Sequence, residues 1–142
     1  MTPVYAQMSG TDVHTIVDAA NHGSAAAQYQ LGVMLLSGKG VTKDPVKAGG
    51  WLLRSAQQGT AGAQFELAKL QLAKIAPGGQ TAAYKWLILS AGNDPDRIAL
   101  RDQVAALVDP QLVPVIKRQA LTWKPQREEL KITAPPKRYV TQ

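Results

Sequence analysis

A segment of the chain recurs 36 positions further along, and this internal repeat limits the possible folds more than any other feature. Residues 19–31 return as residues 55–67, so that Ala27, Gln28, Tyr29 and Leu31 are matched by Ala63, Gln64, Phe65 and Leu67. A second block recurs at an offset of 35, where Ala48, Trp51, Leu52 and Ala56 are matched by Ala83, Trp86, Leu87 and Ala91. Periods of about 20–50 residues are typical of solenoids, in which each repeat stacks on its neighbours. The repeat therefore predicts a solenoid.

Both halves of the repeat unit have the residue spacing of helices. Their apolar residues lie three or four positions apart and so share one helix face: Ala27, Leu31 and Leu35 in the first half, and Ala48, Trp51, Leu52 and Ala56 in the second. Gly38 and Gly40 are expected to end the first helix, Asp44 and Pro45 to begin the second, and Gly59 to close it. The unit is therefore predicted to be a helix, a turn, a second helix and a glycine.

Extended over the whole chain, this pattern predicts an all-α fold, a superhelix of antiparallel helix pairs with about seven helices. The expected full repeats cover residues 24–59 and 60–92, and the flanking helices cover 11–22, 94–108 and 109–123, with a kink at Pro114. Residues 1–10 are expected to form a leader. Residues 124–142, which contain Lys124-Pro125 and Pro135-Pro136, are expected to form a basic extended or disordered tail.

The first unit closely resembles the Sel-1-like repeat family, relatives of the tetratricopeptide repeats. The residues that carry the resemblance are Ala27–Gly32, Gly38–Val41, Asp44, Ala48, Trp51 and Ser55–Gly59. The second unit keeps Ala63–Leu67, Ala83 and Trp86, but it has Ala68 where the family prefers glycine. It also has Ile75–Gly79 in place of the family's glycine-valine-aspartate loop. The turn between the two helices of the second unit is therefore expected to differ.

The resemblance covers about residues 12–92, and residues 103–125 are similar to the helical close that often follows such repeats. It implies a right-handed superhelix that acts as a scaffold or adaptor, commonly in bacterial envelope, secretion and signalling assemblies. It does not imply a particular partner.

The positive charge of the chain is concentrated near its C-terminal end. The net charge is +6, but residues 1–116 contain nine Lys or Arg against eight Asp or Glu, while residues 117–142 contain seven against two. This distribution favours a solvated tail over a phosphate-binding arm. Binding of nucleic acid or another anionic surface through the tail remains the alternative function, although the near-neutral body of the chain disfavours nucleic acid.

The residues that could carry catalysis or bind a cofactor have structural explanations. Gly38-Lys39-Gly40 lacks the spacing and the following Ser or Thr of a phosphate-binding loop, so an interhelix turn is the better interpretation. His14 and His22 are two helical turns apart, which is too far for one metal ion. Asp94 and Asp96 flank Pro95 at the start of a predicted helix, where capping accounts for them.

No function class that depends on such residues is favoured by the sequence. There is no cysteine, and Trp51 and Trp86 recur at the repeat interval, which favours core packing over ligand stacking. We therefore predict a protein that is not an enzyme and has no catalytic residue, cofactor, metal or small-molecule substrate. It is expected to hold another protein or a peptide.

The predicted binding site is the concave surface, which the first helix of each pair lines in tetratricopeptide-like stacks. Since Ala27, Leu31 and Leu35 are expected to face the core, the neighbouring face follows from the helical period. The residues on it are Ala26, Tyr29, Val33 and Leu36 in the first repeat and Gly62, Phe65, Lys69 and Leu72 in the second. The apolar residues would anchor a partner peptide or helix, with Lys69 as a polar fixing point. The alternative is that Tyr29 and Phe65 pack between helices.

The location of the protein is predicted from a short motif. Val4-Tyr5-Ala6 before Gln7 has the small-residue pattern of a signal-peptidase site, which suggests an upstream leader and export to a bacterial periplasm. A short cytoplasmic leader is the alternative. No run approaches 18 apolar residues, so no transmembrane helix is expected.

Overall fold

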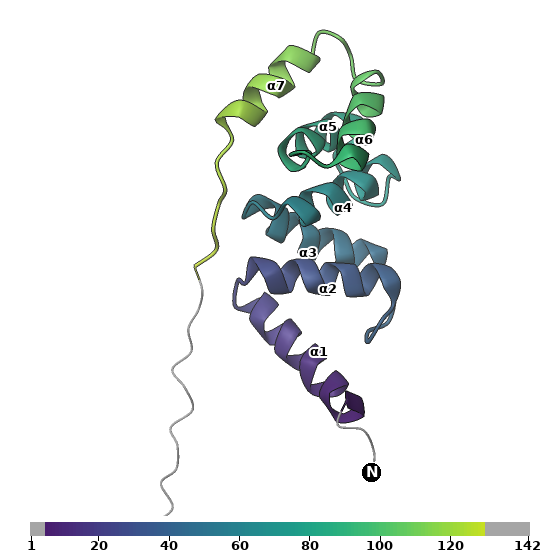
Figure 1. The fold of residues 1–142 in the computed structure, drawn as a ribbon, viewed down its shortest axis with the longest axis vertical. Coiled ribbons are helices and arrows are strands. Elements are labelled where there is room, and N and C mark those ends of the chain that lie inside the picture. The colour runs from purple at the N-terminus through teal and green to yellow at the C-terminus, as the bar shows by residue number, and fades with distance from the viewer. Residues whose placement is uncertain (1–4, 130–142) are drawn as a thin grey trace, which may run out of the picture.

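A computed structural model describes the backbone of residues 5–129, with side chains from residue 13 onward, and this part of the chain contains seven helices and no strand (Figure 1). The helices are α1 (Tyr5–Asn21), α2 (Ala25–Ser37), α3 (Pro45–Gln57), α4 (Ala61–Leu72), α5 (Gly79–Ser90), α6 (Pro95–Ala105) and α7 (Val113–Thr122). The all-α prediction is confirmed.

The helices form an elongated stack in which neighbours in sequence are neighbours in space (Figure 1). From α1 to α6 each helix packs against the next, and α2 also touches α4. The pairs α2–α3 and α4–α5 are the two repeats. Helix α7 packs back on α5, and the chain then returns in an extended conformation beside the stack.

Three boundaries differ from the sequence prediction. Helix α6 ends at Ala105, three residues before the predicted end at 108. Helix α1 begins at Tyr5, inside the predicted leader 1–10. Helix α7 begins at Val113, four residues later than predicted, because the Asp109 carboxylate accepts a hydrogen bond from the Gln111 amide (2.9 Å) and holds a turn there. Pro114 lies in the first turn of α7, where a missing amide hydrogen is tolerated, so it causes no break.

The N-terminal motif proposed for processing begins outside the described residues. Val4 is not described, and neither are the side chains of Tyr5 and Ala6.

Side-chain caps fix the beginnings of several helices. Ser24 accepts a hydrogen bond from the amide of Ala27, and Asp44 accepts one from Lys47 (3.0 Å). The Asp94 carboxylate accepts from the amides of Asp96 and Arg97 (3.0 and 3.1 Å). These bonds satisfy amides that have no partner in the first turn of a helix. The predicted capping role of Asp94 is confirmed.

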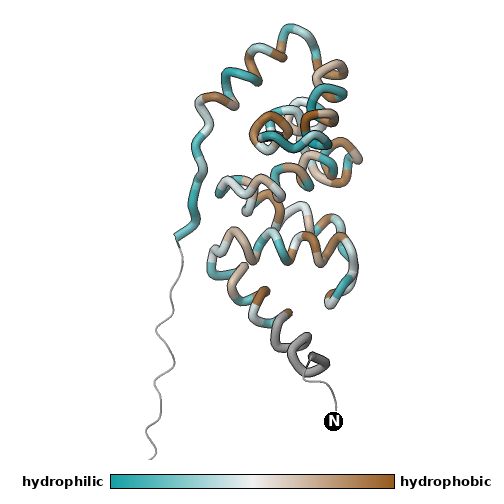
Figure 2. Tube along the Cα trace, viewed as in Figure 1, coloured by the Kyte–Doolittle hydropathy of each residue, from teal (hydrophilic) through white to brown (hydrophobic). Residues whose placement is uncertain are grey.

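The core is built from small and aliphatic residues that recur with the repeat, and Figure 2 shows hydrophobic positions along every described helix of the stack. The fully buried members, each at 0% exposure, are Ala20, Ala48, Leu52, Ala56, Ala63, Ala68, Ala83 and Leu87. Trp86 is 5% exposed and buried as predicted. Trp51, its counterpart, packs against the core but is only partly buried, and the Arg54 guanidinium lies over its ring.

Two buried glutamines repeat the same hydrogen bond one repeat apart. The Gln28 amide donates to the carbonyl of Ala20 (3.2 Å), and the Gln64 amide donates to the carbonyl of Ala56 (3.1 Å). Both carbonyls belong to the last turn of the preceding helix, where intrahelical partners are missing. The glutamine of each repeat therefore joins one helix pair to the next.

Candidate functional site

The predicted face of α2 contains a shallow hollow. It has a volume of about 360 Å³, and its lining residues are Ala26, Tyr29, Gln30, Val33 and Met34. Three of the four residues predicted on this helix line it. The fourth, Leu36, is partly buried and packs on the core. Gln30 and Met34 were not predicted, although Gln30 lies one helical turn after Ala26 and Met34 lies one turn after Gln30.

The predicted residues of α4 lie outside this hollow. The ring of Tyr29 covers Gly62 so closely that an added Cβ at Gly62 would lie 2.7 Å from the ring. Tyr29 thus joins α2 to α4, which was the alternative interpretation of this residue. Leu72 is partly buried against the core.

Two cationic side chains lie over the aromatic ring of Phe65. The Lys69 ammonium lies 4.9 Å from the ring centroid, and the Arg97 guanidinium, at the start of α6, lies 5.3 Å from it. Lys69 is also paired with Glu66 (2.8 Å). The α4 part of the predicted face is therefore more polar than the α2 part, and the apolar anchoring surface is on α2.

A second surface lies along the edge of the stack, where residues 124–129, here called the C-terminal strap, run back from α7 (Figure 1). The strap begins beside Trp123, whose ring meets Trp86 of α5 edge to face at a centroid distance of 6.0 Å. The amide of Gln126 then donates to the carbonyl of Gln57 (2.7 Å). An extended strap agrees with the tail predicted for this part of the chain, but its contacts with the repeats were not foreseen.

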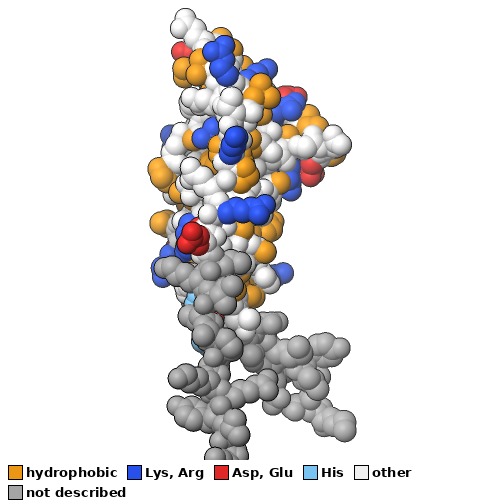
Figure 3. All heavy atoms as spheres, turned by 90° about the vertical axis from the view of Figure 1, so that its left-hand side faces the viewer, with side chains coloured by type: hydrophobic (Ala, Val, Ile, Leu, Met, Phe, Trp, Pro, Cys, Tyr) orange, Lys and Arg blue, Asp and Glu red, His pale blue; other side chains and the backbone are white. Residues whose placement is uncertain are grey.

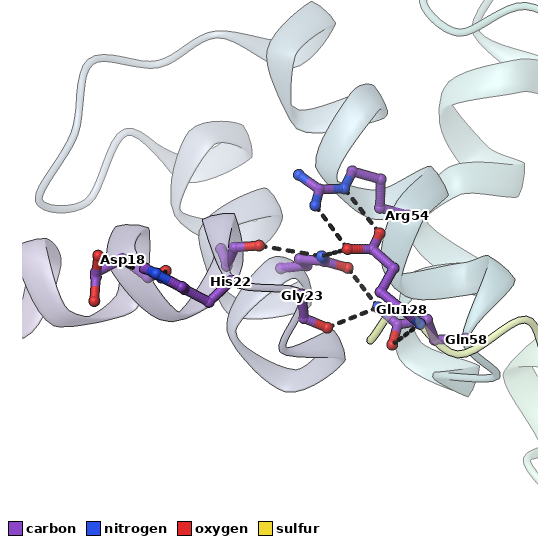
Figure 4. A network of polar contacts seen from close by, with 8 residues as sticks. Asp18, His22, Gly23, Arg54, Gln58 and Glu128 are labelled. Carbon is purple, nitrogen blue, oxygen red and sulfur yellow. Dashed lines mark hydrogen bonds and ion pairs between the residues drawn. The ribbon is translucent and has the colours of Figure 1, made fainter. Parts of the chain in front are cut away.

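The strap ends in a carboxylate site, drawn in Figure 4. Arg54 donates two hydrogen bonds to the carboxylate of Glu128, from Nε (2.9 Å) and Nη2 (2.7 Å), and the buried amide of Gln28 donates a third (3.1 Å). The backbone amide of Glu128 donates to the side-chain carbonyl of Gln58 (3.2 Å). Bidentate pairing with arginine is geometrically specific for a carboxylate.

The groups that bind Glu128 are held in place by bonds of their own. The Arg54 guanidinium lies over the Trp51 ring at 4.8 Å. The Gln58 amide donates to the carbonyl of Gly23 (3.1 Å) and to the side-chain carbonyl of Gln28 (2.9 Å). The hydrogen bond from Arg54 to Glu128 raises the pKa of Arg54 above its ordinary value, against the opposing effect of burial. The site is therefore a preorganised receptor for one carboxylate.

No metal site is found in the described part of the chain. There is no group of three or more His, Asp or Glu side chains among residues 13–129 that could hold a metal ion. Asp18 and His22 pair with each other across one turn of α1, at 3.4 Å (Figure 4). Within the described helices, none is long and apolar enough to cross a membrane.

The comparisons with known proteins agree with this geometry. The family model of the Sel1 repeat matches residues 25–60, which contain α2, α3 and the glycine that closes the unit. Residues 25–60 of the chain therefore form a Sel1 repeat. Proteins with this repeat are typically scaffolds without catalysis, which suggests a protein–protein interaction role.

A solved structure extends the likeness beyond the single matched repeat. The crystal structure of a protective antigen present in uropathogenic Escherichia coli strains, which displays an SLR fold, is similar at a TM-score of 0.69 and 27% sequence identity. The similarity covers 80% of this chain but 26% of the antigen, so the chain spans about a quarter of that protein's length. A comparison with curated proteins found no match.

Proposed function

We propose that this protein is a scaffold that holds a partner protein in the hollow on α2. The observation that carries the proposal is the exposed apolar surface there. Val33 is 38% exposed, although it lies on a helix whose other face is buried in the core. Together with Ala26 and Met34 it lines a hollow that a side chain of a partner can enter. An aromatic or aliphatic anchor in such a hollow contributes much of the affinity of an interface.

The chemistry of the hollow indicates what it would accept. Its lining is mainly apolar, and Gln30 supplies an amide at the rim that can both donate and accept a hydrogen bond. A helix that presents an apolar residue every three or four positions fits a surface of this kind.

The cellular setting belongs to the same proposal. We place the protein in a bacterial envelope assembly, in the periplasm, and the support is the signal-peptidase pattern that precedes Gln7 together with the family resemblance. Fractionation of native cells tests this. A full-length product found only in the cytoplasm would contradict it.

A second function is favoured by the charge near the strap. Lys117, Arg118, Lys124 and Arg127 are exposed on α7 and the strap, and Lys and Arg side chains are spread over the face of Figure 3 while acidic ones are few in view. Such a surface attracts anionic polymers. A salt titration separates the two functions, because binding to phosphates weakens steeply as salt rises, whereas an apolar contact is far less affected.

Replacing Val33 by glutamate is expected to abolish capture of the partner without unfolding the protein. A carboxylate in an apolar hollow would have to be desolvated on binding, so we expect the recovered amount to fall about tenfold or more. The measurement is affinity capture from the source cells at moderate salt, with each retained protein quantified against the parent.

The matched control is Val46→Glu. Val46 is an exposed valine, at 72%, on α3, and it lines a separate hollow between α3 and α4, not the hollow on α2. We expect a true partner to be retained by Val46→Glu and lost by Val33→Glu. We also expect both variants to melt within a few degrees of the parent. Retention of the same partner by both variants would place the binding site elsewhere.

A further inference from the structure

The strap meets the two glycine loops of the stack in a regular way. Pro125 lies over Gly59, where an added Cβ would be 3.3 Å from its ring, and Glu128 lies over Gly23, where an added Cβ would be 3.1 Å from its side chain. Gly23 and Gly59 are equivalent positions of successive repeats. Three residues of extended chain, about 10 Å, thus advance the strap by one repeat.

The edge of the stack recognises the strap by backbone and side chain together. Gln57 and Gln58 accept hydrogen bonds from the amides of Gln126 and Glu128, which are alternate residues of the strap. Such bonds bind any extended chain, whereas the side-chain contacts select particular residues. Here the selected residues are a proline over Gly59 and, three positions later, a glutamate on Arg54.

The carboxylate site belongs to one repeat boundary alone. The residue equivalent to Arg54 in the preceding boundary is Asp18, and in the following boundary it is Leu89. Neither can pair with a carboxylate as arginine does. The carboxylate site therefore does not follow from the repeat pattern, because the core positions recur while Arg54 does not.

The occupied site remains open to solvent. The side chains of Arg54 and Glu128 are 37% and 31% exposed, and a hollow of about 270 Å³ beside them is lined by Gly23, Ser24, Ala25, Gln58, Arg127 and Glu128. The strap is also hydrophilic along its length (Figure 2). Arg54 and Glu128 are thus part-buried, and solvent still screens their ion pair, so we expect that the strap can leave this edge without unfolding the repeats.

We propose that this edge is a binding site for an extended segment of a partner protein with the pattern proline, two residues, glutamate, and that the chain's own Pro125 and Glu128 occupy it in the absence of the partner. The partner's glutamate replaces Glu128 on Arg54 and Gln28, and its backbone replaces that of the strap on Gln57 and Gln58. The strap thereby acts as an internal competitor that sets the affinity of the site.

The test uses the full-length chain and, as the probe, a fluorescent peptide with the sequence of residues 123–129. Binding is followed by fluorescence anisotropy. The Glu128→Ala variant has lost the internal carboxylate, so we expect it to bind the peptide about tenfold or more tightly than the parent. Adding Arg54→Ala to this variant is expected to reverse the gain. Glu129→Ala, at the neighbouring exposed glutamate, is the matched control and is expected to bind like the parent.

A second peptide has glutamine in place of the glutamate that corresponds to Glu128, and it tests whether the carboxylate is recognised. We expect it to bind the Glu128→Ala variant about tenfold more weakly than the first peptide does. Equal binding of both peptides would overturn the proposal. Equal affinity of the parent and Glu128→Ala for the first peptide would also overturn it.

A melting temperature more than about ten degrees lower for Glu128→Ala than for the parent would identify the strap as a fixed structural part. A dimeric parent that dissociates in this variant would identify a second copy as the occupant. The Val33 variants do not touch this edge, so the two proposals fail separately.

Discussion

Replacement of Trp86 by alanine is expected to lower the free energy of unfolding by about 3–5 kcal/mol. Trp86 is 5% exposed in the middle of α5, and α5 packs against α4, α6 and α7. Its removal leaves a cavity and also takes away the ring on which Trp123 rests. Urea denaturation measures the loss. Hydrogen exchange is expected to show weakened protection of α7, because α7 ends at Trp123.

The control is Trp51→Ala, at the equivalent position of the first repeat. Trp51 is only partly buried and lies beside Arg54, so we expect a loss of about 1–2 kcal/mol. The two substitutions remove the same atoms from equivalent helices. The difference between the two losses of unfolding free energy therefore reports how deeply each tryptophan is packed, not the type of residue removed. Equal losses would mean that Trp51 is packed as tightly as Trp86.

The helices were predictable because the repeat supplies two independent copies of one pattern. Ala48 and Leu52 have the same spacing as Ala83 and Leu87, and all four are fully buried. The exception is Trp51, which the repeat predicts to be buried like Trp86. Equivalence in sequence does not fix burial, because Trp86 is covered by α7 and Trp123, which have no counterpart beside Trp51.

The carboxylate site was not predicted, because its partners are far apart in the sequence. Arg54 and Glu128 are separated by 74 positions, and neither periodicity nor composition relates a tail residue to a particular helix. One signal was present. Residues 117–142 contain seven basic residues, and their only acidic residues are Glu128 and Glu129. Such an isolated acidic pair is expected to bind a basic side chain elsewhere in the protein.

The α2 face was predicted better than the α4 face for a physical reason. The helical period gives the direction of a side chain but not what covers it. Val33 points as expected, and Tyr29 lines the hollow although it also packs on Gly62 of α4. Phe65, in contrast, is covered by Lys69 and by Arg97 of α6. The contact with Arg97 depends on the angle at which α6 follows α5, which no local pattern specifies.

The second large effect is expected at Gly32, where α2 crosses α3. An added Cβ at Gly32 would lie 2.7 Å from both Cγ and Cδ2 of Leu52, which is fully buried and has little room to move. Gly32→Ala is therefore expected to destabilise the protein by about 1–3 kcal/mol. The control is Gly50→Ala on α3, where an added Cβ meets no described atom within 4 Å, and there we expect stabilisation by about 0.5–1 kcal/mol.

A double variant separates the clash from other effects of the substitution at Gly32. Leu52→Ala alone is expected to destabilise by about 2–5 kcal/mol. In that background the atoms that oppose a Cβ at Gly32 are gone, so Gly32→Ala is expected to be neutral or stabilising, a reversal of sign that urea denaturation detects. The second repeat already has Ala68 at the equivalent position, fully buried, so a pair of helices can adopt a spacing that accepts a methyl group. If Gly32→Ala is harmless in the parent, α2 and α3 can move apart to the spacing of α4 and α5, and the close approach at Gly32 does not fix the geometry of the first repeat.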